Sequence, residues 1–358
     1  MVTSAPLRVL VVDDSAYNRR NIADILGGRD DVEVVGKAGD GDEALRLVSQ
    51  LKPDAITLDL EMPRMDGFTF LRIMMAKQPT PVIVVSSYSN KENVFKALEL
   101  GAIDFVAKPD RQFSPDPAIK NEILSKVLLV RNLRPLASPP GRVALPPIAL
   151  APRPAEAAPP VRVAATAPRF VVGIASSTGG PSALLDVFSR LPERFPGAIL
   201  IAQHMPDKFT RTFAERLDKK GAVRVVEAQD GDVVSARRAY VCPGKQSMEL
   251  TSASGSLSDL RARVSAPSPS DRYCPSADRL FRSIAQVAGA RAIGVILTGM
   301  GDDGVAGGRA IRAAGGVVIA ESEETAVVYG MPGAAVRAGI ASEVMPLQAI
   351  GDHLAGLT

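Results

Sequence analysis

The sequence has no tryptophan, and it has only two cysteines and two histidines among its 358 residues. Cys242 and Cys274 are too few and too far apart for a disulfide framework, which indicates free thiols in a reducing compartment. No apolar run reaches the roughly 20 residues that a membrane-spanning helix needs. The apolar stretch near residue 10 is too short for a signal peptide and has no cleavage site after it. We therefore expect a cytoplasmic protein without direct membrane insertion.

The sequence also lacks a dense stripe of lysine and arginine interleaved with aromatic side chains. Aromatic residues make up only 4% of the chain, and the net charge is +3. Nucleic-acid-binding domains concentrate basic residues on one face or element, so we expect no nucleic-acid partner. The length and the 46% of hydrophobic residues instead predict a globular protein with two domains.

Proline is concentrated in one segment of the chain. Ten prolines fall within the 34 residues of 135–168, with alanine and arginine between them. Proline fixes φ and lacks the backbone donor, so this segment cannot form a helix or a central strand. It is typical of a semi-rigid linker. We therefore expect one domain in residues 1–130, a linker in 131–168 and a second domain in 169–358.

Short apolar runs alternate with helical patterns on both sides of the linker. The first domain has LRVLVVDD, VEVVGKA, DAITLDL, PVIVVSS and DFVAKP, and the second has RFVVGIAS, GAILIAQH, IGVILTGM and GVVIAE. Near-continuous apolar strands separated by helices predict α/β domains, each with a parallel sheet covered on both faces. In such sheets the ligands and catalytic groups lie at the carboxyl ends of the strands. The polar residues that end each run are therefore the candidates for function.

Acidic and hydroxyl residues end the strands of the first domain. Asp13 and Asp14 end the first strand, Asp59 ends a later one, and Ser86 and Lys108 end two more. A cluster of carboxylates favours a hard cation such as Mg²⁺. A carboxylate can also act as a nucleophile toward a phosphoryl group. Taken singly, each acidic residue could instead be a helix cap.

The motifs VVDDS, LDLEMPRMDG, VVSS and ALELGAIDFVAKP together resemble the receiver domain of response regulators over residues 7–128. The resemblance implies a flavodoxin-like α/β fold. It also implies that Asp59 accepts a phosphoryl group from a CheA-like histidine kinase. The other roles that it implies are Mg²⁺ binding by Asp13, Asp14 and Asp59, and switching by Ser86, Phe105 and Lys108.

The second domain offers a candidate serine nucleophile. The sequence RFVVGIASSTGG changes from an apolar strand to hydroxyls and glycines, and Ser177 lies at that point. A serine needs a positioned base, which must in turn be oriented by an anionic group. His204 follows a strand at the same predicted edge, whereas His353 lies five residues before the last one. Either Asp302 or Asp303 could orient the imidazole, and the spacing does not choose between them.

The motifs SSTGGPSALL, QHMPDKFTRTFAERL, TGMGDDGVAGG and VVYGMPGAA resemble the CheB-type methylesterase domain over residues 170–350. A receiver joined by a linker to this domain is the arrangement of chemotaxis response regulators with protein-glutamate methylesterase activity. The resemblance implies a doubly wound, mostly parallel α/β domain without a cofactor. Its implied substrates are methyl-accepting chemotaxis receptors, whose glutamate methyl esters it hydrolyses and whose glutamines it deamidates. The site residues that it implies are the triad Ser177, His204 and Asp303, with Thr178 and the backbone near Met300 stabilising the oxyanion.

Some positions depart from the family pattern or leave alternatives open. Ser176 is a rival nucleophile, and Cys274 is another. Ser247 lies where the family commonly has histidine, and Glu321 where glutamine is frequent. The SSTGG turn could instead bind a nucleotide, although it lacks the G-x-G-x-x-G pattern. The second domain could also be an output module that binds a partner without catalysis.

The two-domain order also predicts regulation. We expect the unphosphorylated receiver to cover the catalytic edge, and phosphorylation of Asp59 to favour an open enzyme. The segment RYCPSADRLF is a candidate substrate contact, but Ser276 or Asp278 in it could equally cap a helix.

Overall fold

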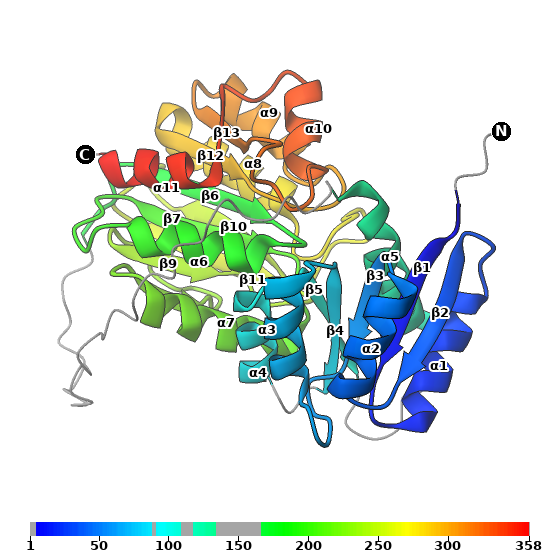
Figure 1. Cartoon of the computed structure of the whole chain (residues 1–358). Coiled ribbons are helices and arrows are strands. Elements are labelled where there is room, and N and C mark those ends of the chain that lie inside the picture. The colour runs from blue at the N-terminus through cyan, green and yellow to red at the C-terminus, as the bar shows by residue number, and fades with distance from the viewer. Residues whose placement is uncertain (1–4, 88–90, 109–116, 134–165, 358) are drawn as a thin grey trace, which may run out of the picture.

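The structure is a computed structural model that describes residues 5–87, 91–108, 117–133 and 166–357. Two α/β domains lie side by side in it (Figure 1). Most of the predicted linker, residues 134–165, lies outside the described residues. Within the described part of the chain, no helix is both long enough and apolar enough to cross a membrane.

The first domain is a parallel sheet of five strands with helices on both faces, as the apolar runs predicted. The strand order is β2-β1-β3-β4-β5, so the direction of winding reverses between β1 and β3. Its elements are β1 (Leu7–Val12), α1 (Ala16–Gly27), β2 (Val32–Ala38), α2 (Gly41–Leu51), β3 (Ala55–Leu58), α3 (Gly67–Lys77), β4 (Val82–Ser87), α4 (Lys91–Glu99), β5 (Asp104–Lys108), α5 (Pro117–Leu129) and the 3₁₀ turn Val130–Asn132.

The second domain has a sheet of seven strands in the order β14-β13-β12-β6-β7-β9-β8, and every pairing in it is parallel. A separate antiparallel pair, β10 and β11, packs beside it. The elements are β6 (Val171–Ser176), α6 (Gly180–Arg190), β7 (Ala198–Gln203), α7 (Asp207–Lys220), β8 (Arg224–Glu227), β9 (Arg238–Val241), β10 (Ser247–Ser252), β11 (Leu260–Ser265), α8 (Ala277–Ala288), the 3₁₀ turn Gly289–Arg291, β12 (Ala292–Ile296), α9 (Val305–Ala313), β13 (Val317–Glu321), α10 (Met331–Arg337), β14 (Glu343–Met345) and α11 (Leu347–Gly356).

The topology of the second sheet fixes the place of a site. From β6 the chain builds outward through β7 on one side, and it later returns to build β12, β13 and β14 on the other side. The loops that follow β6 and β12 therefore lie where the winding of the sheet reverses, at the carboxyl ends of the strands, which is where α/β proteins bind ligands. Ser177 follows β6, and residues 297–303 follow β12.

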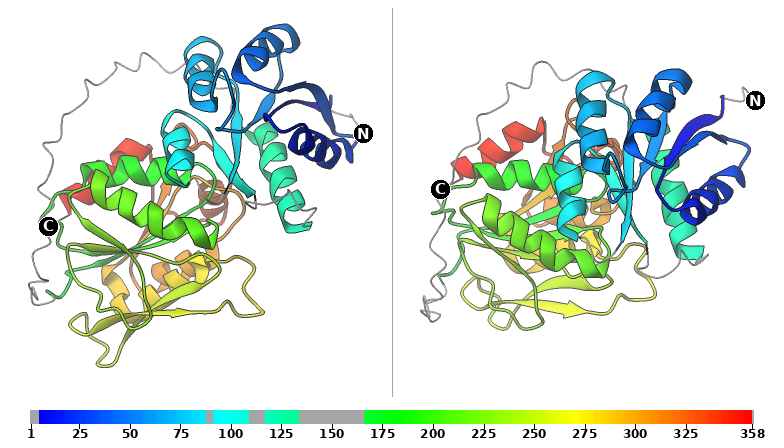
Figure 2. Two further views of the ribbon diagram at one scale, coloured as in Figure 1. Left: turned by 90° about the horizontal axis from the view of Figure 1, so that it is seen from below. Right: turned by 60° about the horizontal axis from the view of Figure 1, so that its bottom comes forward.

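The two domains share one hydrophobic cluster. Helix α4 of the first domain packs against α6 and α7 of the second, and both views of Figure 2 show this contact. Such burial removes apolar surface of both domains from water, which stabilises the contact between the two domains.

Candidate functional site

The turn after β6 is tight for a structural reason. Gly179 has φ 78°, in the left-handed region that glycine tolerates. A Cβ at Gly180 would lie 2.2 Å from Oε1 of Gln203, so no larger residue fits at this position. The packing of neighbouring side chains therefore explains both glycines, and a phosphate-binding role is not needed to account for them.

The two adjacent serines differ in environment. Ser176 is fully buried, and its hydroxyl donates to Oε1 of Gln203 at 2.7 Å. Ser177 is partly exposed, and its backbone N–H donates to the carbonyl of Thr298 at 3.0 Å. The amide of Gln203 also donates to the carbonyls of Ser177 and His204, at 3.0 and 2.9 Å. Ser176 therefore has a structural partner, whereas the hydroxyl of the partly exposed Ser177 has no hydrogen-bond partner among the described residues.

His204 is paired with Asp303. The ring Nε2 of His204 lies 2.9 Å from Oδ2 of Asp303, whose side chain is only 1% exposed. The same carboxylate accepts the backbone N–H groups of Ala277 and Asp278, at 2.8 and 2.9 Å, in the first turn of α8. A helix N-terminus stabilises a negative charge. The fold therefore fixes the Asp303 carboxyl group against the imidazole.

Asp302 has a different role. It accepts hydrogen bonds from the Tyr273 hydroxyl at 2.8 Å and from the Arg272 guanidinium at 3.1 Å, and its side chain is half exposed. The Tyr273 ring stacks on the His204 ring, with centroids 5.3 Å apart and an angle of 10° between the planes. Burial and the hydrogen bond to Asp302 raise the pKa of Tyr273, so its hydroxyl stays protonated as a donor. Asp302 thus fixes the aromatic ring that covers the imidazole.

Residues 298–301 lie close to the turn after β6, which contains Ser177. A Cβ at Gly299 would lie 2.7 Å from the Cβ of Ser177, so glycine is required there. Met300 follows and is 50% exposed. Within the described residues, the backbone N–H groups of Thr178 and Met300 have no hydrogen-bond partner. These donors are free to bind a negative charge that develops beside Ser177.

One contact expected of a catalytic triad is absent between the described side chains: no hydrogen bond joins the Ser177 hydroxyl to His204. Such bonds are often long before substrate binds. The Thr178 hydroxyl donates to Oδ2 of Asp104, a residue of the first domain, at 2.5 Å. The residue next to Ser177 is therefore engaged by the other domain in this structure.

The remaining candidates of the second domain lie outside the His204–Asp303 pair. Cys274 contacts the Gln246 carbonyl at 3.4 Å, and burial raises the pKa of its thiol, which disfavours a nucleophilic thiolate. Ser276 caps α8 by accepting the N–H of Arg279, and Asp278 accepts N–H groups at the start of α9. Both residues of the RYCPSADRLF segment thus have structural roles.

The first domain gathers its acidic residues at the carboxyl ends of β1 and β3. Ligand oxygens of Asp13, Asp14 and Asp59 all lie within 4.8 Å of one another. The Nζ of Lys108 lies 3.0 Å from Asp13 and 2.5 Å from Asp59. Helix α1 is capped by Ser15 instead, so helix capping does not account for Asp13 and Asp14. Three carboxylates with hard oxygen donors fit a Mg²⁺ ion.

The protonation of this cluster depends on burial and on Lys108. Burial raises the pKa of Asp59 to about 6, although the Lys108 charge opposes the shift. Burial alone would lower the pKa of Lys108, but Asp59 and Asp13 outweigh it and raise that pKa. Ser86, at 1% exposure, lies on β4 between the strands of Asp59 and Lys108.

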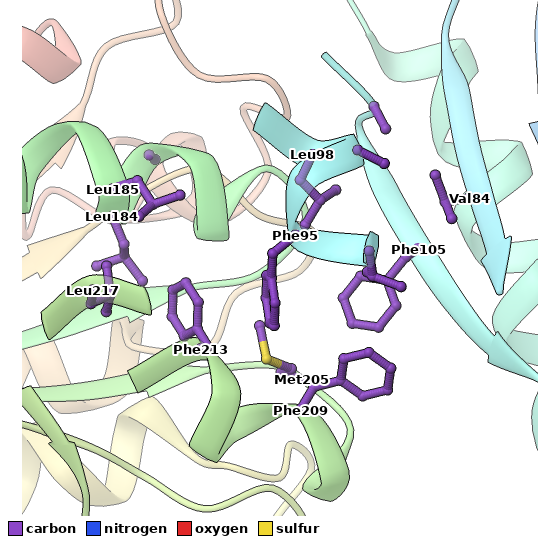
Figure 3. Close-up of a cluster of buried hydrophobic side chains, with 14 of the residues drawn as sticks. Val84, Phe95, Leu98, Phe105, Leu184, Leu185, Met205, Phe209, Phe213 and Leu217 are labelled. Atoms are coloured by element: carbon purple, nitrogen blue, oxygen red, sulfur yellow. The ribbon is translucent and has the colours of Figure 1, made fainter. Parts of the chain in front are cut away.

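Phe105 lies at the boundary between the domains (Figure 3). Its ring centroid is 4.6 Å from that of Phe209 on α7. Phe95 on α4 stacks on Phe213, also on α7, with centroids 5.6 Å apart. At the rim of this cluster, Arg216 of α7 pairs with two glutamates of α4, Glu92 and Glu99. An apolar centre with a charged rim is typical of a specific interface.

Sequence reasoning missed two residues of the site. Gln203 joins the Ser177 and His204 turns through one buried side chain, and a polar residue ending a buried strand was the available signal. Tyr273 lies in the RYCPSADRLF segment, which was a candidate substrate contact, but it was not singled out, because it is 69 residues from His204 in sequence and no spacing rule connects them.

Comparisons with known proteins agree with this arrangement. Residues 172–354 match the CheB methylesterase family, and residues 9–113 match the response regulator receiver domain. "Protein-glutamate methylesterase/protein-glutamine glutaminase 1" of Myxococcus xanthus is 47% identical, over 100% of this chain and 99% of that protein. "Protein-glutamate methylesterase/protein-glutamine glutaminase 6" of Anaeromyxobacter dehalogenans is 51% identical, over 97% of this chain and 95% of that protein.

A solved structure supports the fold of the second domain. The crystal structure of the Thermotoga maritima CheB methylesterase catalytic domain is 36% identical with a TM-score of 0.51, and it covers 53% of this chain and 98% of that chain. The chain belongs to the CheB family: it is a protein-glutamate methylesterase/protein-glutamine glutaminase with an N-terminal receiver domain.

Proposed function

We propose that Ser177, His204 and Asp303 form the catalytic triad of this methylesterase. The observation that carries the proposal is the His204–Asp303 pair, at 2.9 Å with a buried Asp303, at the edge of the sheet where the partly exposed Ser177 begins the neighbouring turn. Because Nε2 of His204 faces Asp303, Nδ1 is the nitrogen left to accept a proton. Asp303 then stabilises the imidazolium that forms.

The chemistry follows from these positions. His204 takes the Ser177 proton while the hydroxyl oxygen attacks the γ-carbonyl of a glutamate methyl ester. The N–H groups of Thr178 and Met300 bind the oxyanion of the tetrahedral intermediate. The intermediate collapses as His204 returns the proton to the departing methoxide, which releases methanol. Water, deprotonated by His204, then hydrolyses the acyl-enzyme to glutamate and free Ser177. With a glutamine amide, ammonia leaves in place of methanol.

A shared site for both substrates makes a direct prediction. A receptor signalling domain carrying methyl esters should inhibit ammonia release from the glutamine form competitively, with an inhibition constant equal to its own KM for methanol release. Steady-state assays of both products in one reaction measure this. Ammonia release that is indifferent to the methylated domain would require two separate sites.

We also propose that Asp59 accepts the phosphoryl group, from a CheA-like histidine kinase. Asp13, Asp14 and Asp59 would hold Mg²⁺, which neutralises phosphoryl oxygens when bound. Lys108 already bridges two of these carboxylates, so its ammonium is placed to bind a phosphoryl oxygen on Asp59. Ser86 and Phe105 would carry the change toward the domain interface.

The interface supports inhibition by the unphosphorylated receiver. Asp104 accepts a hydrogen bond from the hydroxyl of Thr178, the residue after Ser177. The aromatic cluster around Phe105 and Phe209 packs the receiver against the second domain. We propose that phosphorylation of Asp59 shifts the equilibrium toward an open enzyme. Its substrates would be methyl-accepting chemotaxis receptors, and the enzyme itself would act in the cytoplasm. We propose no nucleic-acid partner.

Weakening the interface should raise basal activity. Deleting residues 1–168 should increase methanol release without phosphodonor. Arg216→Ala removes the ion pairs of Arg216 with Glu92 and Glu99, which are partly exposed and together worth about 0.5–1 kcal/mol, so methanol release by the full chain should rise roughly two- to fivefold.

Arg211→Ala is the matched control, because Arg211 lies on the same helix but pairs with Glu215 of that helix. Its activity should equal that of the wild type. Autoinhibition by domain contact is contradicted when the deletion leaves activity unchanged and the truncated protein is folded.

A further inference from the structure

A buried carboxylate lies directly behind the turn that follows β12. Glu321, the last residue of β13, has no exposed surface. Its Oε2 accepts the backbone N–H of Thr298 at 2.7 Å, and its Oε1 lies 3.0 Å from the Thr325 hydroxyl. Within the described residues, no cationic side chain forms an ion pair with it. A buried carboxyl without a cation is costly when it is ionised.

Thr298 connects this carboxyl to the proposed nucleophile. The Thr298 carbonyl accepts the N–H of Ser177 at 3.0 Å, and its hydroxyl donates to the carbonyl of Thr178 at 2.9 Å. The N–H of Val328 donates in turn to the Thr298 hydroxyl at 2.9 Å. Thr298 alone therefore connects Glu321 to the backbone of Ser177 and to the turn that contains Met300.

We propose that Glu321 is a positioning residue: its neutral form fixes the 298–300 turn beside Ser177, and its ionised form slows turnover. The proposal rests on the triad given above. Oε2 accepts the N–H of Thr298 in both forms, and Oε1 accepts the Thr325 hydroxyl when the carboxylate is ionised. In the neutral form the acid proton on Oε1 is donated to the Thr325 hydroxyl, which then reverses its bond to Oε1 and still accepts the N–H of Leu347 at 2.9 Å. Glutamine would make the same contacts.

The ionised form is different in its electrostatics. It places a buried negative charge behind the donors that would bind the oxyanion, and this charge destabilises the transition state relative to the ground state. The effect acts on the chemical step and not on receptor docking, so it should appear in kcat and leave KM unchanged.

The surroundings allow both forms near neutral pH. Burial raises the pKa of Glu321 to about 7, hydrogen bonds from Thr298 and Thr325 oppose the shift, and the Asp186 charge adds to it. The titratable and charged groups on the elements packed around β13 are Asp186, Arg190, Arg309, Arg312, Arg337, Glu343, Asp352 and His353. Of these groups, the Asp186 charge raises the pKa of Glu321. Arg190 forms ion pairs with Asp186 and Asp352.

The test compares methanol release by full-length wild type and Glu321→Gln across pH, with Mg²⁺ and acetyl phosphate present. We expect wild-type kcat to fall roughly tenfold relative to the variant as the pH rises through about 7, with equal KM values. Glu323→Gln is the matched control, since Glu323 is exposed on the same loop, and it should follow the wild type. Glu321→Ala leaves the Thr298 N–H without its acceptor and should lose activity at every pH, and Gln should rescue this loss.

A second readout does not depend on turnover. The folded pKa of Glu321, about 7, lies above its ordinary value of 4.5, so the folded state binds more protons and its stability falls as the pH rises between these values. The Tm of Glu321→Gln should therefore rise relative to the wild-type Tm over this range and remain higher at higher pH. Identical kcat–pH profiles for wild type and Glu321→Gln, or no Tm gap at alkaline pH, overturn the proposal. The Tm gap keeps its meaning even where Ser177→Ala is active and the triad itself fails.

Discussion

Ser177→Ala should abolish methanol release and ammonia release together. The variant lacks the oxygen that forms the acyl-enzyme, while the oxyanion donors and the His204–Asp303 pair stay in place. Loss of the nucleophile in serine hydrolases costs about 10³-fold or more, up to about 10⁶-fold. The measurement is methanol released from a methylated receptor signalling domain by phosphorylated full-length protein. The Tm should change little, because Ser177 is partly exposed and its hydroxyl has no hydrogen-bond partner among the described residues.

Ser176→Ala is the control that distinguishes the two neighbouring hydroxyls. It leaves Oε1 of Gln203 buried without its donor, so the protein should lose about 1–3 kcal/mol of stability and keep most of its activity. The opposite pattern, an inactive Ser176→Ala and an active Ser177→Ala, would move the nucleophile to Ser176.

Asp303→Asn should reduce kcat by about 10⁴-fold, the cost of the equivalent change in a serine protease triad. An asparagine can present its NH₂ group to Nε2 of His204 and so favour the tautomer with the proton on Nδ1. That tautomer cannot accept the proton of Ser177. The same variant also loses the negative charge that stabilises the imidazolium. Single-turnover rates of methanol formation measure the chemical step directly.

Asp302→Asn is the matched control for this experiment. Asp302 is the neighbouring residue, it is half exposed, and it holds Tyr273 and Arg272 instead of the imidazole. Its loss loosens the ring stacked on His204, for which we expect a reduction of roughly tenfold or less. Equal losses in the two variants would contradict the assignment of Asp303 as the orienting residue.

The strand ends of this protein were predictable from its sequence because parallel strands leave a strong apolar signal. The apolar runs before Asp59, Ser177 and His204 are continuous and buried, and these three polar residues directly follow the strands. Once these strands are placed side by side in one parallel sheet, their ends must share an edge. The chemistry at each edge therefore followed from local pattern.

Other parts of the site depend on contacts between segments far apart in the chain. The spacing could not choose between Asp302 and Asp303, because the choice depends on N–H groups of α8 that only the fold brings to Asp303. The Thr178–Asp104 hydrogen bond joins two domains across 74 residues of sequence. Strands β8 to β11 were not predicted either, because β8 and β9 have only four residues each and several residues of β10 and β11 are polar.

The most direct test of the account is methanol release from a methylated receptor signalling domain by wild type and Ser177→Ala, each with and without Mg²⁺ and acetyl phosphate. We predict that the wild-type rate rises with the phosphodonor and that Ser177→Ala releases no methanol in either condition. Methanol release by Ser177→Ala would contradict the catalytic assignment. A wild-type rate that does not change, with Asp59 shown to be phosphorylated, would contradict the inhibition by the receiver.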